Sequence, residues 1–256
     1  MIGAIIGDIV GSRFEFRNHF STEFELFTKE CSFTDDTICT VAVADALLKG
    51  ISFEESLLYW CRKYPFPKGA YGRSFARWIK MPFPVPYNSF GNGSAMRVSP
   101  VGWFFHSESE TLQYATLSAE CTHNHPEGIK GACAVAQAIF MLRSGIEKEE
   151  VCNIIFQTYS YSNPGTCDSI RRSNTFNETC QVTVPQAIAC FLESKDFEHA
   201  IRFAVSIGGD SDTIAAITGS MAEACYDIPE NIQSAALSYL PSDIISVLSD
   251  FNLKEI

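Results

Sequence analysis

The chain has 256 residues and no stretch of linker composition, so we expect one domain over residues 1–256 with a substantial core. Its 19 Lys and Arg residues against 30 Asp and Glu residues give a net charge of −11, which argues against a nucleic-acid backbone or an anionic membrane as the main ligand. Ten cysteines without a Cys-x-x-Cys pair are typical of buried thiols in a reducing compartment, and we therefore expect a cytoplasmic protein.

The first eleven residues are apolar, but they lack a basic n-region and contain Asp8. This segment is too short to cross a bilayer, so we expect neither a signal peptide nor an anchor. Gly3, Gly7 and Gly11 recur every four residues. On a helix this spacing places them along one face, which predicts close packing against another helix.

Glu15 follows this segment and lies between Phe14 and Phe16. A glutamate at the surface is the default interpretation of such a position.

Two acidic tetrads stand far apart and read almost alike: residues 34–37 are Thr-Asp-Asp-Thr and residues 210–213 are Asp-Ser-Asp-Thr. An apolar, proline-free segment follows each, so we expect each tetrad to open a buried helix. A single Asp or Thr there is usually an N-cap, and either tetrad alone could be only that. A cap needs one side-chain oxygen, whereas each tetrad offers two carboxylates and hydroxyls. Together they predict a site for Mg²⁺ or Mn²⁺, with four carboxylates able to hold two ions.

Helical periodicity covers most of the remaining chain. Capping-box spacing at Ser52 with Glu55, and at Ser107 with Glu110, predicts two helix starts. No run of alternating strands is visible, so the pattern indicates a mainly α protein.

The second half of the chain shows further helix signals. A helix is expected after Pro126 that reaches Ser144 and ends at Gly145. Pro185 is placed for the first turn of another helix, and a third is expected over residues 197–205.

Two long stretches resist a helical interpretation. Residues 64–89 hold five prolines and many aromatics, and residues 159–183 are rich in Ser, Asn and Thr. Long loops in a compact domain are usually functional or mobile. We expect both to form walls of a substrate cleft.

Residues 91–94 read Gly-Asn-Gly-Ser, ahead of a helix expected near Ala95. Backbone N–H groups in such a loop can hold a phosphate because glycine permits close approach and unusual φ. A plain turn is the alternative, since Asn-Gly is a strong turn dipeptide. Cys121, His123 and His125 could in principle ligate zinc, but no second ligand pair accompanies them.

The motifs at residues 7–15, 33–37, 91–97, 122–123 and 208–213 together resemble the ADP-ribosylglycohydrolase family, over almost the whole chain. The resemblance implies a compact, all-α, orthogonal helical bundle with a centre of two Mg²⁺ ions, for which Mn²⁺ can substitute. The metal ligands that it implies are Thr34, Asp35, Asp36, Asp210, Asp212 and Thr213.

The same resemblance implies a binding site for ADP-ribose. In it the loop formed by Gly91, Asn92, Gly93 and Ser94 holds the diphosphate and a ribose, and His123 lies beside the ligand. Glu15 gates the cleft and approaches the metal in the serine-specific branch of the family. We expect Asp35 or Asp36 to steer the attacking water.

The function implied is Mg²⁺-dependent hydrolysis of the glycosidic bond between ADP-ribose and a modified acceptor, by a monomer. The expected partner is an ADP-ribosylated protein or a small ADP-ribose derivative, with nucleic acid disfavoured by the net charge. The acceptor linkage stays open. One alternative is an ADP-ribose reader without turnover. Another is a phosphohydrolase of the haloacid-dehalogenase type, whose Asp-x-Asp-x-Thr signature the second tetrad approaches, although that motif ends a β-strand.

Overall fold

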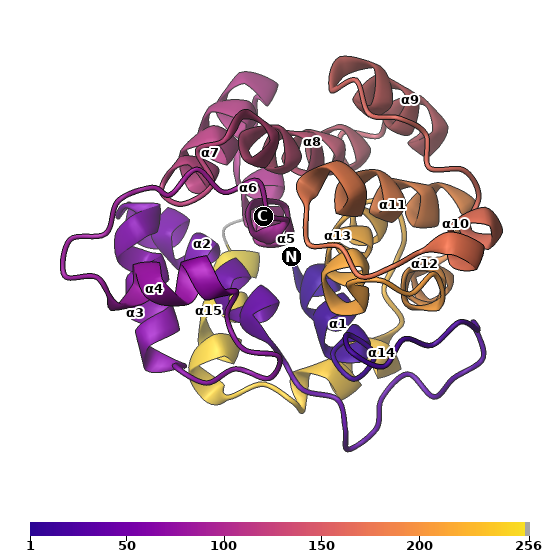
Figure 1. Cartoon of the computed structure of the whole chain (residues 1–256), viewed down its shortest axis with the longest axis horizontal. Coiled ribbons are helices and arrows are strands. Elements are labelled where there is room, and N and C mark those ends of the chain that lie inside the picture. Colours follow the sequence, from indigo (N-terminus) through magenta and orange to yellow (C-terminus); the bar gives the residue numbers. More distant parts are fainter. Residues whose placement is uncertain (254–256) are drawn as a thin grey trace.

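Helices are the only regular elements in the computed structural model, which describes residues 1–253, and the all-α prediction is confirmed (Figure 1). The helices of this described part are α1 (Ile2–Gly11), α2 (Asp35–Lys49), α3 (Phe53–Lys63), α4 (Arg73–Lys80), α5 (Gly93–Met96), α6 (Ser99–Phe104), α7 (Glu108–Glu120), α8 (Pro126–Arg143), α9 (Lys148–Thr158), α10 (Cys167–Ser173), α11 (Cys180–Glu193), α12 (Phe197–Ser206), α13 (Ser211–Glu223), α14 (Glu230–Leu237) and α15 (Ser242–Asn252).

The absence of a sheet from residues 1–253 excludes the phosphohydrolase alternative. Strand-like pairing in that part of the chain is limited to isolated bridges, such as the one between Thr34 and Lys68. The second tetrad follows a turn after α12 and begins α13. Its threonine, Thr213, also directly follows Asp212, one position earlier than in the phosphohydrolase signature.

Helices α1 and α13 cross at the centre of the molecule with almost no side chain between their backbones (Figure 1). A Cβ atom on Gly3 would lie 2.3 Å from the Gly219 carbonyl oxygen, and one on Gly7 would lie 2.0 Å from the Ala215 carbonyl oxygen. A Cβ on Gly11 would lie 2.5 Å from the Cα of Asp212. The predicted glycine face is therefore confirmed, and it brings α1 directly against the second tetrad.

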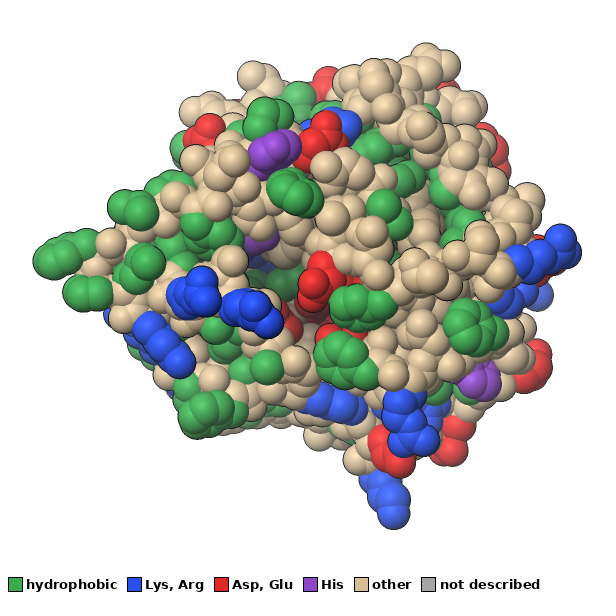
Figure 2. Space-filling view, viewed as in Figure 1, with side chains coloured by type: hydrophobic (Ala, Val, Ile, Leu, Met, Phe, Trp, Pro, Cys, Tyr) green, Lys and Arg blue, Asp and Glu red, His purple; other side chains and the backbone are tan. Residues whose placement is uncertain are grey.

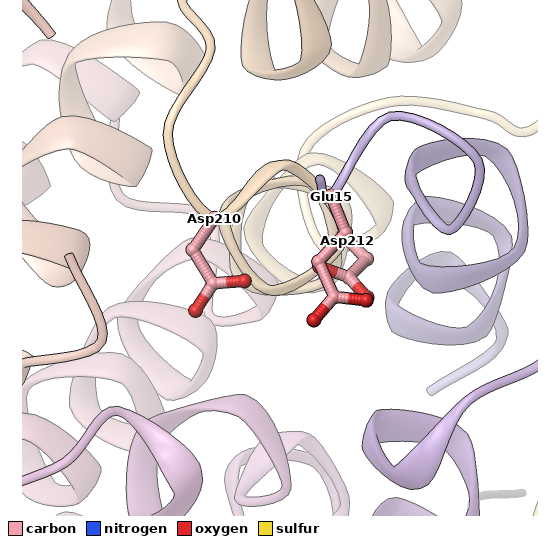
Figure 3. A group of neighbouring side chains, drawn as sticks. All are labelled: Glu15, Asp210 and Asp212. Carbon is pink, nitrogen blue, oxygen red and sulfur yellow. The ribbon is translucent and has the colours of Figure 1, made fainter. Parts of the chain in front are cut away.

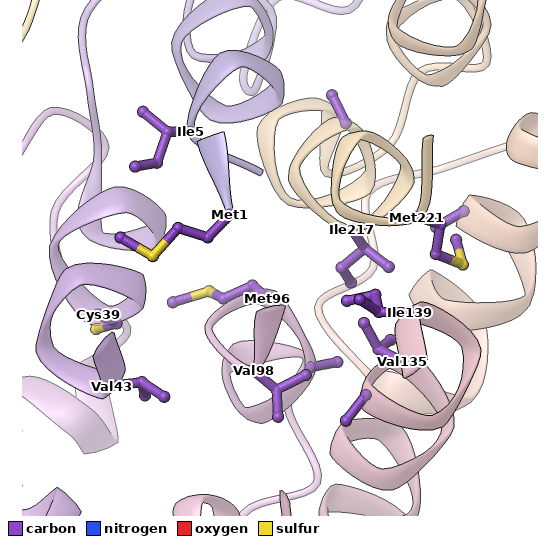
Figure 4. Close-up of a cluster of buried hydrophobic side chains, with 14 of the residues drawn as sticks. Met1, Ile5, Cys39, Val43, Met96, Val98, Val135, Ile139, Ile217 and Met221 are labelled. Atoms are coloured by element: carbon purple, nitrogen blue, oxygen red, sulfur yellow. The ribbon is translucent and has the colours of Figure 1, made fainter. Parts of the chain in front are cut away.

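The core surrounds this crossing, with α2 and α3 on one side and α11 and α12 on the other (Figure 1). Apolar side chains from five segments meet there (Figure 4): Met1 at the N-cap of α1 and Ile5 on that helix, Cys39 and Val43 from α2, Met96 and Val98 at and after the end of α5, Val135 and Ile139 from α8, and Ile217 and Met221 from α13. Within residues 1–253, each helix is too short or too polar to span a bilayer.

Most predicted helix boundaries are confirmed. Ser52 accepts a hydrogen bond from the Glu55 amide at the start of α3, and Ser107 accepts one from the Glu110 amide at the start of α7. Helix α8 ends before Gly145, whose φ is +86°.

The position expected for Pro185 is wrong, because it lies inside α11 rather than in its first turn. The helix begins five residues earlier, where the Cys180 amide donates to the Phe90 carbonyl at 3.0 Å. This partner is 90 residues away in sequence, so local helix signals could not reveal the start. The two stretches expected as loops also contain short helices, α4 and α10.

The close contact between the glycines of α1 and the backbone of α13 predicts that an added side chain at this crossing lowers the stability of the protein. Gly7→Ala should destabilise the protein by about 3 kcal/mol despite the better helix propensity of alanine, because two backbones must separate. Thermal and denaturant unfolding would measure the loss. Gly72→Ala is the matched control, since a Cβ there has no neighbour within 4 Å, and its effect should stay within about 0.5 kcal/mol. Equal stability of the two variants would contradict the proposed role of the crossing.

Candidate active site

A cavity of about 320 Å³ opens on one face of the bundle and collects residues from distant parts of the sequence. Figure 2 shows acidic side chains inside a hollow near the centre of this face, with basic side chains on one rim. The predicted site residues that line the cavity are Glu15, Asp35, Asp36, Gly91, Asn92, Gly93, His123, Asp210, Asp212 and Thr213. Thr34 and Ser94 lie behind the cavity wall, and both are fully buried.

Asp8 on α1 fixes the first tetrad. Its Oδ1 atom accepts a hydrogen bond from the Thr34 hydroxyl at 2.7 Å, and its Oδ2 atom accepts bonds from the amides of Thr34 and Thr37 at 2.9 and 3.1 Å. Thr34 is also the N-cap of α2, because its hydroxyl accepts a bond from the Asp36 amide. Thr34 and Asp8 therefore satisfy the backbone amides at the start of α2. The carboxylates of Asp35 and Asp36 remain available to the cavity.

The second tetrad follows a tight turn with two left-handed glycines, Gly208 and Gly209, whose φ values are +70° and +81°. The Asn18 side chain holds this turn, since it both accepts from the Gly209 amide and donates to the Gly209 carbonyl, at 3.0 and 2.8 Å. Asp210 occupies the N-cap position of α13, but its side chain makes no capping bond. It accepts a hydrogen bond from Asn92 at 2.7 Å instead. Asp210 therefore does not cap α13, whereas Asp212 Oδ1 accepts a hydrogen bond from the Thr213 amide at 3.1 Å.

Glu15 joins the second tetrad from the segment that follows α1. Carboxylate oxygens of Glu15, Asp210 and Asp212 lie within 4.8 Å of one another (Figure 3). The Thr213 hydroxyl donates to Asp36 Oδ1 at 3.3 Å, which links the two tetrads directly. The fold thus brings residues 177 positions apart into one acidic cluster.

Electrostatics in this cluster favour protonation or a bound cation. Burial raises the pKa of Glu15 to about 8, with the charge of Asp212 adding to the effect. Burial also raises the pKa of Asp210 to about 7, although hydrogen bonds from Asn92 and Asp212 lower it. The pKa values of Asp35, Asp36 and Asp212 are raised well above their ordinary values, by burial and then by neighbouring carboxylates.

The chemistry of the cluster fits a hard cation. Within residues 1–253, no Lys or Arg side chain forms an ion pair with these carboxylates. The Oδ2 atom of Asp36 is buried and accepts no hydrogen bond from a described residue. Buried carboxylate oxygens without a cationic partner are costly, and oxygen ligands are those that Mg²⁺ and Mn²⁺ prefer.

The loop at residues 91–94 has two engaged and two free amides. The Gly91 amide donates to Ser89 Oγ at 3.1 Å, and the Asn92 amide donates to the Glu178 carbonyl at 2.7 Å. The amides of Gly93 and Ser94 donate to no described residue. At the cavity wall the loop can therefore offer the Gly93 N–H group to an anion, whereas Ser94 is buried behind the wall and its hydroxyl donates to the Gly128 carbonyl.

Glycine at position 93 is explained by space rather than by an unusual φ, because neither Gly91 nor Gly93 has a positive φ. A Cβ on Gly93 would lie 3.1 Å from Nε2 of His123. The loop glycines therefore allow the histidine to reach the cavity beside them. His123 is 5% exposed, and burial lowers its pKa well below the ordinary value, with the Arg97 charge lowering it further.

Residues 64–89 form one wall of the cavity, as expected, and seven of them line it, including Arg73 and Phe75 of α4, which sequence reasoning did not name. The stretch 159–183, expected as another wall, contributes Glu178 alone. Arg97 also lines the cavity and is 1% exposed. Its place at the end of the 91–97 motif was the available signal.

Comparisons with known proteins agree with this geometry. A model of the family described as ADP-ribosylglycohydrolase matches residues 1–252. The ADP-ribosylhydrolase ARH3 of Danio rerio is 25% identical, with 89% of this chain and 82% of the relative covered. The ADP-ribosylarginine hydrolase Tri1 of Pseudomonas putida (strain GB-1) is 26% identical, with 93% and 73% covered.

A solved structure described as an ADP-ribosylglycohydrolase-related protein complex shares the fold, with a TM-score of 0.75 at 21% identity, over 100% of this chain and 96% of the other. The family match and the hydrolases among its relatives make this helical protein a hydrolase. The chain belongs to the ADP-ribosylglycohydrolase family.

The raised pKa values predict how stability depends on pH and cations. Without divalent cations, the folded state holds extra protons, so its stability is greatest at low pH and is lost as pH rises through the folded pKa values of about 7 and 8. The melting temperature in EDTA should therefore fall between about pH 5 and pH 8. Mg²⁺ should raise it more at pH 8 than at pH 5, because cations and protons compete for the same oxygens.

Asp36→Asn and Asp212→Asn are the matched variants for this measurement. Each removes a carboxylate that is buried among others, so each should raise the melting temperature in EDTA near pH 8 and weaken the response to Mg²⁺. Unfolding of both variants under all conditions would show that the carboxylates serve the fold instead.

Proposed function

We propose that the protein is a Mg²⁺-dependent hydrolase that cleaves the glycosidic bond between ADP-ribose and a modified acceptor, and so reverses ADP-ribosylation. The observation that carries this proposal is the convergence of both tetrads, Glu15, the 91–94 loop and His123 on one cavity. Such a site combines oxygen ligands for cations with a free amide for an anion, as a sugar diphosphate requires. The contiguous core supports operation as one domain.

The cations would be held by the tetrads, through Thr34, Asp35, Asp36, Asp210, Asp212 and Thr213. Thr34 would contribute the hydroxyl lone pair that its bonds to Asp8 and to the Asp36 amide leave free. Four carboxylates and two hydroxyls are enough for two Mg²⁺ ions, and Mn²⁺ would serve in their place. Asp8 and Asn92 would orient these ligands, since they already hold Thr34 and Asp210.

The reaction replaces the bond from C1″ of the ribose to the acceptor by a bond from C1″ to a water oxygen. Bound Mg²⁺ would act as a Lewis acid that makes a bound water more acidic. Asp35 or Asp36 would orient the attacking water and accept its proton, because both carboxylates face the cavity. The departing acceptor takes up a proton in turn, so that water supplies OH to C1″ and H to the acceptor. Glu15 would gate the entrance beside Asp212, and the free loop amide would bind the diphosphate.

The acceptor is proposed to be a modified protein side chain. One relative supports this class because it is named for ADP-ribosylarginine, whereas the other is named only for ADP-ribosyl hydrolysis. The net charge of −11 disfavours an acceptor with a nucleic-acid backbone.

Substrate hydrolysis with and without cations tests the proposal. A panel of ADP-ribosylated arginine, serine and nucleic-acid substrates should yield ADP-ribose from at least one protein substrate. EDTA should abolish turnover, and Mg²⁺ or Mn²⁺ should restore it without need for Zn²⁺. Full turnover in excess EDTA would contradict the metal assignment. Binding of ADP-ribose without turnover on any substrate would instead favour a reader.

The role of the loop is tested by Gly93→Val. The branched side chain would push against His123 Nε2 and obstruct the free amide, so ADP-ribose affinity should fall by about tenfold or more. Calorimetry with Mg²⁺ present would measure it. Gly72→Ala is the control, because Gly72 lines the same cavity and its Cβ would have free space. An unchanged affinity of Gly93→Val for ADP-ribose would show that the loop is a plain turn and does not bind the diphosphate.

A further inference from the structure

A buried chain of hydrogen bonds stands behind His123. The Arg97 guanidinium donates from Nη2 to Thr122 Oγ1 at 2.8 Å, and to the Ser118 carbonyl at 2.6 Å. Thr122 Oγ1 in turn lies 2.7 Å from His123 Nδ1. The exposed fractions of Arg97, Thr122 and His123 are 1%, 0% and 5%, so water has almost no access to these bonds.

The donors and acceptors of this chain fix the direction of each proton. A guanidinium can only donate, so Thr122 Oγ1 must accept from Arg97. The Thr122 hydroxyl has one proton of its own. His123 Nδ1, at 2.7 Å, is the strong acceptor beside it, whereas the Cys121 sulfur is a weak acceptor that already lies 3.7 Å from Arg97 Nη2. If Nδ1 carried a proton and donated it, the buried hydroxyl proton would be left with the weak sulfur acceptor, which is unfavourable. The hydroxyl therefore donates to Nδ1.

The opposite ring nitrogen faces the site. Nε2 of His123 forms no hydrogen bond with a described residue, and it lies beside the loop glycines, 3.1 Å from the Cβ position of Gly93 and 3.6 Å from that of Gly91. His123 also lines the cavity. Since Nδ1 accepts a bond, Nε2 carries the proton of the neutral ring.

We infer that Arg97 and Thr122 are positioning residues that hold His123 as the neutral Nε2–H tautomer, so that His123 donates a hydrogen bond to an anionic oxygen of the ligand received by the 91–94 loop. The ligand side of this inference rests on the proposed function. His123 thus acts as a fixed hydrogen-bond donor and not as a general base. Burial and the Arg97 charge lower its pKa, which keeps the ring neutral.

Nitrogen NMR of the histidine rings tests the tautomer without any ligand or turnover. The protein has five histidines, and comparison with His123→Gln assigns the signals of residue 123. We expect a protonated Nε2 and an unprotonated, hydrogen-bonded Nδ1 at neutral pH. A protonated Nδ1 in the wild type would overturn the inference, and this result needs no variant that alters Thr122.

Two substitutions at Thr122 distinguish the effect of its hydroxyl group from the effect of its side-chain volume. Thr122→Ser keeps the hydroxyl and should keep the tautomer, whereas Thr122→Val keeps the shape and should release the ring into a mixture of tautomers. By calorimetry with Mg²⁺, ADP-ribose affinity should fall about tenfold in Thr122→Val and stay within about twofold in Thr122→Ser.

The outcomes distinguish this inference from the proposed function. Equal ADP-ribose affinities in wild type and a folded Thr122→Val variant would overturn the role of the hydroxyl, even if hydrolysis were observed. The expected tautomer in a protein that neither binds ADP-ribose nor hydrolyses any substrate would instead reject the proposed function and the ligand role of His123. If Thr122→Val does not fold, the wild-type tautomer and the affinity of Thr122→Ser decide the case.

Discussion

The close crossing of α1 and α13 is the constraint on which the site depends. Glycines allow the two backbones to touch, and a Cβ at Gly7 or Gly11 would overlap main-chain atoms of α13. The same helix that touches α13 carries Asp8, whose carboxylate holds the start of α2. One short helix therefore sets the distance between the two tetrads. A wider separation of α1 and α13 would move Asp212 away from Asp36.

The site is built at a cost in stability. Carboxylates with raised pKa values gather where no Lys or Arg of the described chain forms an ion pair with them, and burial of such groups is unfavourable unless they are neutralised. The rest of the structure holds them there through neutral donors, such as Asn92 on Asp210 and Thr213 on Asp36. This arrangement is typical of a functional site, where local preference is sacrificed to chemistry.

The sequence revealed the parts of the site that follow local rules. Both tetrads begin helices, the glycine spacing marks the face of α1, and the predicted serine caps are formed, because each of these depends on neighbours within a few residues. It could not reveal the contacts that depend on distant partners. Asn92 reaches Asp210 across 118 positions, and Phe90 sets the start of α11. The misplacement of Pro185 and the burial of Ser94 behind the cavity wall have the same cause.

The two ends of the cavity differ in chemistry. The tetrads and Glu15 gather carboxyl groups at one end, whereas the loop end presents the free amide of Gly93, with the Arg97 guanidinium buried nearby. A diphosphate is received better by the second end than among the carboxyl groups of the first. Under the proposed function, this polarity alone orients ADP-ribose with its diphosphate at the loop and its reactive ribose at the acids. A neutral His123 suits this arrangement, because a directed donor at the loop end would select the orientation of the diphosphate.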